Sequence, residues 1–199
     1  MKFKIKASAY KAVALAQSKE KSRYYLCGVF VERQSITATN GHILLKYNLE
    51  EETGLDTVGY EPFIMSVDTS EKGFAPAKNH AGELFLFGDT ETLILEFWHI
   101  SEDGEKLGKR HGVCGFEIID GTFPDYKRVI PDHTQSKGCR HIALDAGYIQ
   151  TFQKADKLLG GKGVIVLTLG NSASSPILIN LGDKAPIIGV QMPCKSAWE

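Results

Sequence analysis

The sequence of 199 residues lacks the features that mark several specialised classes of protein. No run of about 18 apolar residues is present, so no segment is expected to span a membrane. The basic N-terminus, MKFKIKASAY, has no apolar core of a secretory signal. The cysteines have no CxxC spacing, and a chain of this length does not need disulfides for stability. We therefore expect no metal site, and reduced cysteines in a cytoplasmic protein. The four cysteines are Cys27, Cys114, Cys139 and Cys194.

Catalytic signatures are also missing. The sequence contains no P-loop, GxGxxG, HExxH or GxSxG motif, and its six histidines are scattered. His42 follows Asn40-Gly41, but no orienting partner lies near it in sequence, so a strand residue is a better interpretation than a catalyst. We expect no cofactor and no enzymatic activity. The net charge of −1 excludes a protein coated in basic charge and leaves room for a local basic face.

What is present is a globular composition, with 43% hydrophobic residues and three similar sets of elements. In the first set, Ser8 is a candidate cap of its helix, and Asn40-Gly41 predicts a hairpin turn. That set is a strand at Phe3 to Ala7, a helix at Ser8 to Lys19, and strands at Tyr25 to Glu32, Ser35 to Thr39 and His42 to Leu49.

The second and third sets repeat this order. Gly73 and Pro76 predict a short or broken second helix, whereas Asp145 and Gly160-Gly161 bound a clear third helix. The second set consists of a strand at Pro62 to Asp68, a helix in Thr69 to Lys78, and strands at Glu83 to Phe87, Thr92 to Trp98 and Gly112 to Ile119, with a loop at Ser101 to Lys109. The third set consists of a strand at Arg140 to Leu144, a helix at Asp145 to Leu159, and strands at Val164 to Leu169, Pro176 to Asn180 and Pro186 to Met192.

These sets predict an α+β protein of about three βαβββ units, at 1–50, 60–120 and 139–194. Between the last two units lies GTFPDYKRVIP, Gly121 to Pro131, which we name the connector. Pro124 and Pro131 favour an extended, non-helical segment, while Phe123, Tyr126 and Val129 are more apolar than a solvated linker requires.

Four stretches resemble one family. RYYLCGVFVE, TATNGHILL, GTFPDYKRVIP and PIIGVQMP are similar, in the same order, to the YYLNG strand, TDGHRL hairpin, FPDYRRV-P connector and terminal VMPM of the bacterial DNA polymerase III beta sliding clamp. The resemblance implies the DNA-clamp fold, with helices on one face of antiparallel sheets. Residues 1–131 resemble the complete middle domain of that clamp, and 132–199 resemble half of its third domain.

The resemblance also implies a function. Clamps of this family are dimeric rings of twelve units that encircle duplex DNA and dock polymerases and other proteins through clamp-binding motifs, with a loader that opens the ring. Three units per chain predict a homo-oligomer of four chains if the curvature is kept. The alternative is a clamp-like module, a decoy or adaptor, that occupies clamp-binding motifs without encircling DNA. This alternative is suggested by the third unit, which corresponds to half of a clamp domain and lacks the other half in this sequence.

Basic residues on the predicted helices are candidates for contact with DNA phosphates, although solvated helix faces would have the same pattern. Tyr24 and Tyr25 stand where paired tyrosines of the family approach DNA, and they could equally be alternating strand residues. The candidates are Lys11, Lys19, Lys21, Arg23, Tyr24, Tyr25, Lys154, Lys157 and Lys162.

The family's peptide groove maps onto the hairpin, the connector and the last strand. In this mapping His42 is a wall of the groove, and Gln191 and Cys194 depart from the aliphatic residue and the methionine of the family, which should change the preferred peptide. Core packing is the alternative role for each groove residue, above all for Leu44 and Val129. The groove residues are Leu26, Thr39, Gly41, His42, Leu44, Pro124, Arg128, Val129, Val190, Met192 and Pro193.

Overall fold

The structure is a computed structural model that describes residues 2–49, 61–75, 82–102, 105–131, 142–182 and 186–195. The first part contains β1 (Lys2–Lys6), α1 (Ala7–Ala14), the 3₁₀ turn η1 (Lys21–Leu26), β2 (Val29–Val31), β3 (Ser35–Thr39) and β4 (Ile43–Asn48). It continues with β5 (Phe63–Ser66), η3 (Lys72–Phe74), β6 (Glu83–Asp89), β7 (Ile94–Ile100), β8 (Lys106–Gly115), β9 (Glu117–Ile119) and η4 (Tyr126–Val129). The last part contains α2 (Ala146–Leu158), β10 (Ile165–Thr168), β11 (Ile177–Leu181) and β12 (Ile187–Gln191).

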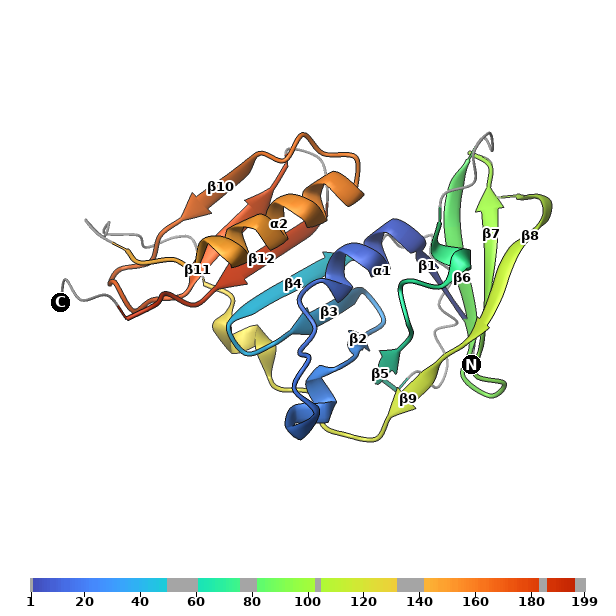
Figure 1. Cartoon of the computed structure of the whole chain (residues 1–199), viewed down its shortest axis with the longest axis horizontal. Coiled ribbons are helices and arrows are strands. Elements are labelled where there is room, and N and C mark those ends of the chain that lie inside the picture. The colour runs from blue at the N-terminus through green and yellow to red at the C-terminus, as the bar shows by residue number, and fades with distance from the viewer. Residues whose placement is uncertain are drawn as a thin grey trace.

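The strands form two antiparallel sheets (Figure 1). A four-stranded sheet has the order β1-β6-β7-β8, and an eight-stranded sheet has the order β10-β11-β12-β4-β3-β2-β5-β9. The first two units exchange their first strands, because β1 pairs with β6 of the second unit and β5 pairs with β2 of the first. The third unit joins the larger sheet through β12, which pairs with β4.

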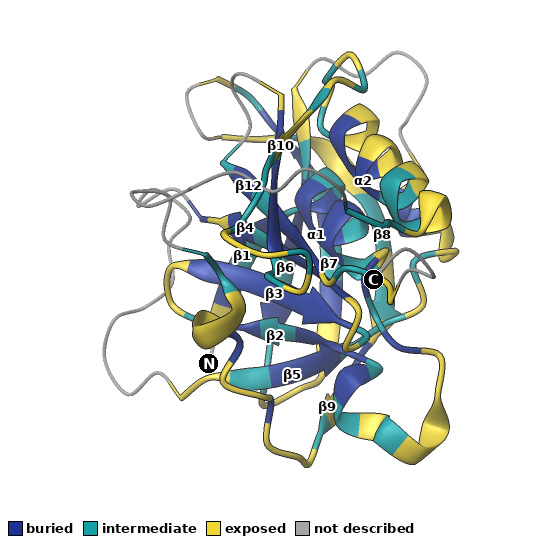
Figure 2. Cartoon of the chain, turned by 90° about the vertical axis from the view of Figure 1, so that its left-hand side faces the viewer, coloured by how far each residue is buried: buried dark blue, intermediate teal, exposed yellow. Residues whose placement is uncertain are grey.

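Both helices pack on one face of the larger sheet and against each other, as Figure 1 shows. Phe152 of α2 is fully buried there, and a Cβ at Gly189 of β12 would come within 2.5 Å of its ring. Glycine is therefore needed at 189 for α2 to approach the strand this closely. Buried residues concentrate in the strands and on the sheet-facing sides of the helices (Figure 2), which confirms the predicted class of helices on one face of antiparallel sheets.

A second apolar cluster lies on the opposite face of the larger sheet. Side chains of neighbouring strand residues alternate between faces, so Leu44 enters this cluster while Ile43 and Leu45 enter the main core. We call it the connector cluster, because two of its members come from the connector. Its buried members are Leu26, Leu44, Ile64, Phe123, Tyr126, Leu178 and Val190.

Most of the predicted elements are confirmed. The helix α2 begins after Asp145, whose side chain accepts a hydrogen bond from the Gly147 N–H at 2.7 Å, and it ends before Gly160, which has φ +83°. Phe152 and Ala155 are its buried residues on the predicted stripe, flanked by the half-buried Ile149 and Leu159. The broken second helix is a single 3₁₀ turn within the described residues of that segment.

Two predictions in the first unit are wrong. Tyr25 to Glu32 is not one strand, because the chain turns through η1 and only Val29–Val31 pairs in the sheet. The aromatic residues suggested a strand, but the backbone N–H of Ser18 donates to the Leu26 carbonyl at 2.9 Å and holds the turn instead. Ser8 does not cap α1, since β1 leads directly into the helix and no side-chain bond caps it.

Three further predictions need correction. Lys106 to Lys109 belong to β8 and not to a loop, because an edge strand tolerates exposed charge. The connector is not wholly extended, since η4 fits as a single turn between its two prolines. Residues 142–144 are not a strand; the third unit has no companion unit in this chain with which to exchange first strands.

Some expectations concern residues outside the described ranges, among them Cys139, Arg140 and His141. Among the helices of the described residues, none has the length and apolar content required to cross a membrane.

Candidate functional site

The hairpin turn between β3 and β4 is held by its own side chains. The Asn40 carboxamide oxygen accepts hydrogen bonds from the N–H groups of His42 at 2.9 Å and Ile43 at 3.0 Å. The Thr39 hydroxyl accepts from the Gly41 N–H at 3.0 Å and donates to the Ile43 carbonyl at 2.7 Å. Gly41 has φ +90°, a conformation that glycine adopts without strain. The predicted turn is confirmed, and it presents His42 to solvent.

The last strand lies directly beside this hairpin. Leu44 of β4 is opposite Val190 of β12, and the Met192 N–H donates to the His42 carbonyl at 2.9 Å. The His42 ring also stacks on Tyr148 of α2, with ring centroids 6.0 Å apart. Residues about 150 positions apart in sequence therefore meet at one end of the β4–β12 pair.

The connector is anchored across the same sheet face. The Phe123 ring stacks on Phe30 at 4.7 Å between centroids, with the ring planes 3° apart. The Tyr126 hydroxyl donates to the Glu32 carboxylate, and Lys127 Nζ lies 3.2 Å from the same group. Burial alone would raise the pKa of Glu32, but the hydrogen bonds from Tyr126, Lys127 and Ser35 outweigh burial and hold that pKa below its ordinary value.

The structure divides the predicted groove residues into two groups. Leu26, Thr39, Leu44 and Val190 are buried, and three of these four belong to the connector cluster. Gly41, His42, Pro124, Arg128, Val129, Met192 and Pro193 are exposed or half-buried. Met192 lies beside the hairpin, whereas Arg128 pairs with Asp125 within the connector at 3.0 Å.

Sequence reasoning missed several members of the connector cluster. Phe123, Tyr126 and Leu178 are buried in it, and Ile130 and Ile188 pack against it. The apolar content of the connector was a signal for the first two. Leu178 and Ile188 could have been found from the alternation of side chains along β11 and β12, once the face of each strand was known.

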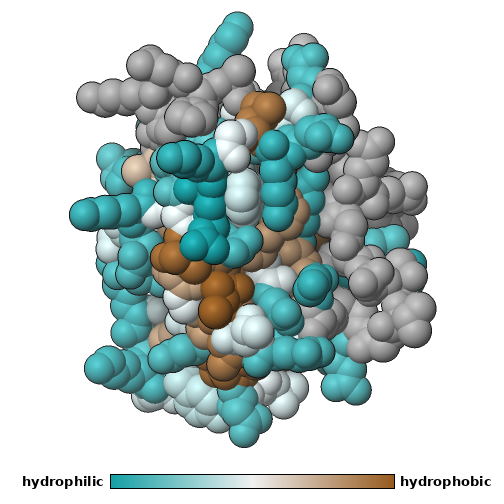
Figure 3. Space-filling view, turned by 90° about the vertical axis from the view of Figure 1, so that its right-hand side faces the viewer, coloured by the Kyte–Doolittle hydropathy of each residue, from teal (hydrophilic) through white to brown (hydrophobic). Residues whose placement is uncertain are grey.

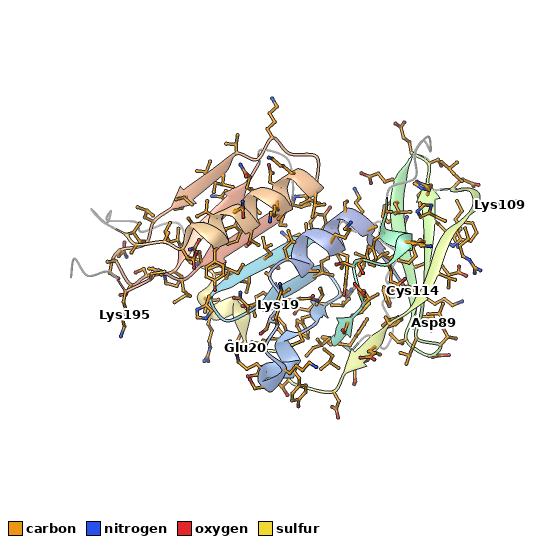
Figure 4. The ribbon with its side chains drawn as sticks, in the orientation of Figure 1. Lys19, Glu20, Asp89, Lys109, Cys114 and Lys195 are labelled. Carbon is orange, nitrogen blue, oxygen red and sulfur yellow. The ribbon has the colours of Figure 1, made fainter. Side chains whose placement is uncertain are left out.

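The basic candidates also fall into two groups. Lys154 and Lys157 are exposed on α2, Lys162 follows that helix, and Lys11 is half-buried on α1. The remaining candidates belong to η1 or precede it: Lys19, Lys21, Arg23, Tyr24 and Tyr25. Figure 4 places Lys19 and the neighbouring Glu20 in this part of the molecule.

The η1 group lies close to the hairpin and the connector cluster. The Arg23 guanidinium pairs with Glu20 at 2.7 Å, and its Nη1 would lie 2.8 Å from a Cβ at Gly41. Tyr25 packs against the connector cluster, while the Tyr24 side chain is 53% exposed. Neither tyrosine is in a strand.

A separate cavity of about 610 Å³ lies between the start of α1 and the loop that follows α2. Lys162 is the one basic candidate in the lining of this cavity, and none of the predicted groove residues lines it. Asp156 at this cavity is fully buried and accepts a hydrogen bond from the Gly163 N–H at 2.6 Å. A Cβ at Gly161 would come within 2.2 Å of its carboxylate, so this loop requires glycine.

Comparison with known proteins links this arrangement to one fold. No protein-family model matches the sequence. The beta sliding clamp of Vibrio cholerae is 24% identical over 180 residues, which cover 86% of this chain and 40% of that protein. The sliding clamp (DNA polymerase III subunit beta) of Bartonella birtlesii, solved with bound griselimycin, superimposes with a TM-score of 0.57 at 19% identity, over 98% of this chain and 66% of that one. This chain has the fold of a bacterial beta sliding clamp.

The Bacillus subtilis sliding clamp is similar to the same extent, with a TM-score of 0.58 at 14% identity over 98% of this chain and 64% of that clamp. The chain thus spans 40% of the length of the Vibrio protein and about two-thirds of the solved clamps. In this sliding-clamp fold the hairpin, the connector and the last strand meet on the sheet face opposite the helices.

Proposed function

We propose that the protein is a sliding-clamp-like, non-catalytic processivity factor that docks clamp-binding peptides and contacts duplex DNA through its helix face. The observation that carries this proposal is the pairing of β12 with β4. It brings Val190 of β12, and Met192 just after that strand, beside the hairpin that presents His42, on the sheet face that holds the anchored connector.

A peptide that binds here would add apolar side chains to a cluster that is already formed. The Met192 side chain is 37% exposed, and its flexible thioether adapts to differently shaped partners. Val129 is exposed to the same fraction, 37%, and would form part of the rim from the connector side. The partners that this chemistry fits are polymerases and other proteins with a QLxLF-like or acidic-apolar motif.

Peptide binding is tested by fluorescence anisotropy with a labelled QLxLF-like peptide. Met192→Ala and Val129→Asp are expected to weaken binding, the second more strongly because it places a charge on an apolar rim. Val113→Asp is the matched control, since Val113 is exposed on the other sheet, in β8. Absence of wild-type binding at high micromolar protein would remove the docking proposal.

For the ring, we propose four chains of three units each, with 1–131 as a complete clamp domain and 132–199 as half of one. Exposed Lys154 and Lys157 of α2 would then approach the phosphates, with a loader to open the ring. Light scattering coupled to size exclusion is expected to give a mass near four chains. A closed ring should also stay on circular DNA and slide off linear DNA.

The alternative, a clamp-like module that never encircles DNA, is favoured by one observation. The strand β10 ends the larger sheet, and its Val166 side chain is 57% exposed at that edge. A mass of one chain at all protein concentrations, together with retained peptide binding, would establish this alternative and exclude the ring.

A further inference from the structure

The four-stranded sheet has an outer face that the functions proposed above do not use. On its inner face Leu86, Leu95 and Phe97 enter the main core. Alternation along the strands places Phe85, Phe87 and Trp98 on the other face. Phe85 is directly opposite Trp98, and Phe87 is diagonal to it, so three aromatic rings occupy adjacent positions.

Lysines cover this aromatic platform. Lys4 Nζ lies 4.4 Å from the centroid of the Phe85 ring. Lys106 Nζ lies 4.5 Å from the centroids of both the Phe87 and the Trp98 rings. These are cation–π distances, and they hold two ammonium groups directly above the rings.

Two carboxylates of this face, Glu96 and Glu83, are paired with neighbouring groups. Glu96 binds Arg110 at 2.6 Å and accepts from the Trp98 indole N–H at 3.0 Å, and Glu83 binds Lys6 at 2.9 Å. Within the described part of the chain, no carboxylate forms an ion pair with Lys4 or Lys106. The platform therefore has two ammonium groups over its rings, of which Lys106 also attracts the Glu96 carboxylate electrostatically.

The surroundings are apolar at the centre and polar at the border. Ile94 is 43% exposed and Val113 is 52% exposed. Figure 3 looks onto the side of the molecule where β6, β7 and β8 lie, and shows an apolar strip bordered by hydrophilic side chains. At the border, Lys109 of β8 and Asp89 of β6 project from this end of the molecule (Figure 4).

We propose that the outer face of the four-stranded sheet binds single-stranded nucleic acid. Unpaired bases would stack on Phe87 and Trp98, and Lys4 and Lys106 would move from the rings to the phosphates. Aromatic side chains on a sheet, together with cations that follow the backbone, are the combination by which proteins bind single strands, with two or three bases per platform.

Two other ligands fit this face less well. Duplex DNA has phosphates for the lysines, but its bases are stacked and expose no face to the rings. An apolar peptide would cover Ile94 and Val113 but would have to displace two ammonium groups without supplying an anion. A single strand satisfies the rings and the cations together. This site lies on a different sheet from the candidate groove, so a test of single-strand binding is independent of the clamp proposal.

The test uses Trp98 as its own reporter. The sequence contains two tryptophans, Trp98 and Trp198, so Trp198→Phe leaves Trp98 as the only one. Oligothymidylate of about ten nucleotides, within the usual size of single-strand sites, is titrated while Trp98 fluorescence is recorded. We expect quenching that saturates and that weakens as salt is raised.

Variants separate the contributions. Phe87→Leu should lower the affinity at least about fivefold, while Phe87→Tyr keeps a ring and should retain it. Lys106→Gln should weaken binding and reduce the slope of affinity against salt by about one. Lys195→Gln is the matched control, because that lysine is exposed at the end of the molecule far from the four-stranded sheet (Figure 4), and it should leave oligothymidylate binding unchanged. Circular dichroism melts verify that each variant is folded.

Three outcomes would overturn the proposal. The first is no quenching of Trp98 at low salt. The second is binding that Lys154→Gln lowers and Phe87→Leu does not, which would assign the strand to the helix face. The third is equal quenching by polyglutamate, which has charge but no bases and would indicate a docking surface for an acidic protein.

Discussion

The hydrogen bond from Tyr126 to Glu32 offers a sharp test of how the connector is held. Tyr126 is 4% exposed, and its hydroxyl donates to a carboxylate that also receives hydrogen bonds from Ser35 at 3.1 Å and Lys127 at 3.2 Å. Tyr126→Phe removes this one donor and keeps the ring in the connector cluster. The change therefore isolates the bond from the apolar packing.

The expected loss of unfolding free energy follows from the kind of bond. A hydrogen bond to a charged group contributes about 1.5–3 kcal/mol. Because two other donors to Glu32 remain, we expect about 1.5 kcal/mol for Tyr126→Phe, measured at pH 7 as a lower urea midpoint with an unchanged m-value. The variant should also bind the clamp-motif peptide more weakly, since the connector forms one side of the proposed groove.

The pH dependence tests whether the acceptor is charged. The folded-state pKa of Glu32 is lowered, so its contribution to stability is complete above the unfolded pKa of about 4.3 and is lost as the pH falls through the folded pKa. The difference between wild type and Tyr126→Phe should therefore shrink at acid pH.

The matched control is Tyr10→Phe, whose buried hydroxyl donates to the neutral carbonyl of Met65 at 3.2 Å. This control should cost about 1 kcal/mol at either pH. A Tyr126→Phe loss below about 0.5 kcal/mol at pH 7, or one that does not change with pH, would refute the reasoning.

Other substitutions test the packing, each by urea or thermal denaturation. Gly189→Ala should destabilise by about 1–3 kcal/mol, because its Cβ would lie 2.5 Å from the Phe152 ring, and a neutral effect would mean that α2 moves freely. Asp145→Ala should cost about 1 kcal/mol by removing the cap of α2, and Asp145→Ser should restore most of it. Phe123→Ala should cost about 3 kcal/mol by removing the stack on Phe30, and should weaken peptide binding; unchanged affinity would separate the connector from the groove.

Elements with a local signal could be predicted from sequence. The helix α2 has an N-cap, a buried stripe and a glycine at its end, and the β3–β4 hairpin has Asn40-Gly41. In each case the residues that specify the conformation lie within a few positions of one another, so no knowledge of the remaining chain was needed.

Elements defined by distant partners could not be predicted in this way. Tyr24 and Tyr25 have a strand composition, yet η1 forms because Ser18 bonds to Leu26. The charged residues from Lys106 onwards looked like a loop, yet they pair with β7 as an edge strand. The same pattern of residue types fits both outcomes, and the hydrogen-bonding partner decides between them.

For the candidate site, the resemblance indicated which segments to examine, and the placement of their side chains came from the packing. The motifs indicated the hairpin, the connector and the last strand. They did not indicate that the Leu26, Leu44 and Val190 side chains are buried while the Met192 side chain is exposed. Periodicity determines that neighbouring residues of a strand face opposite ways. Which face meets the connector depends on strand pairing between residues far apart in the chain, such as Leu44 with Val190, and that pairing exists only once the sheet has formed.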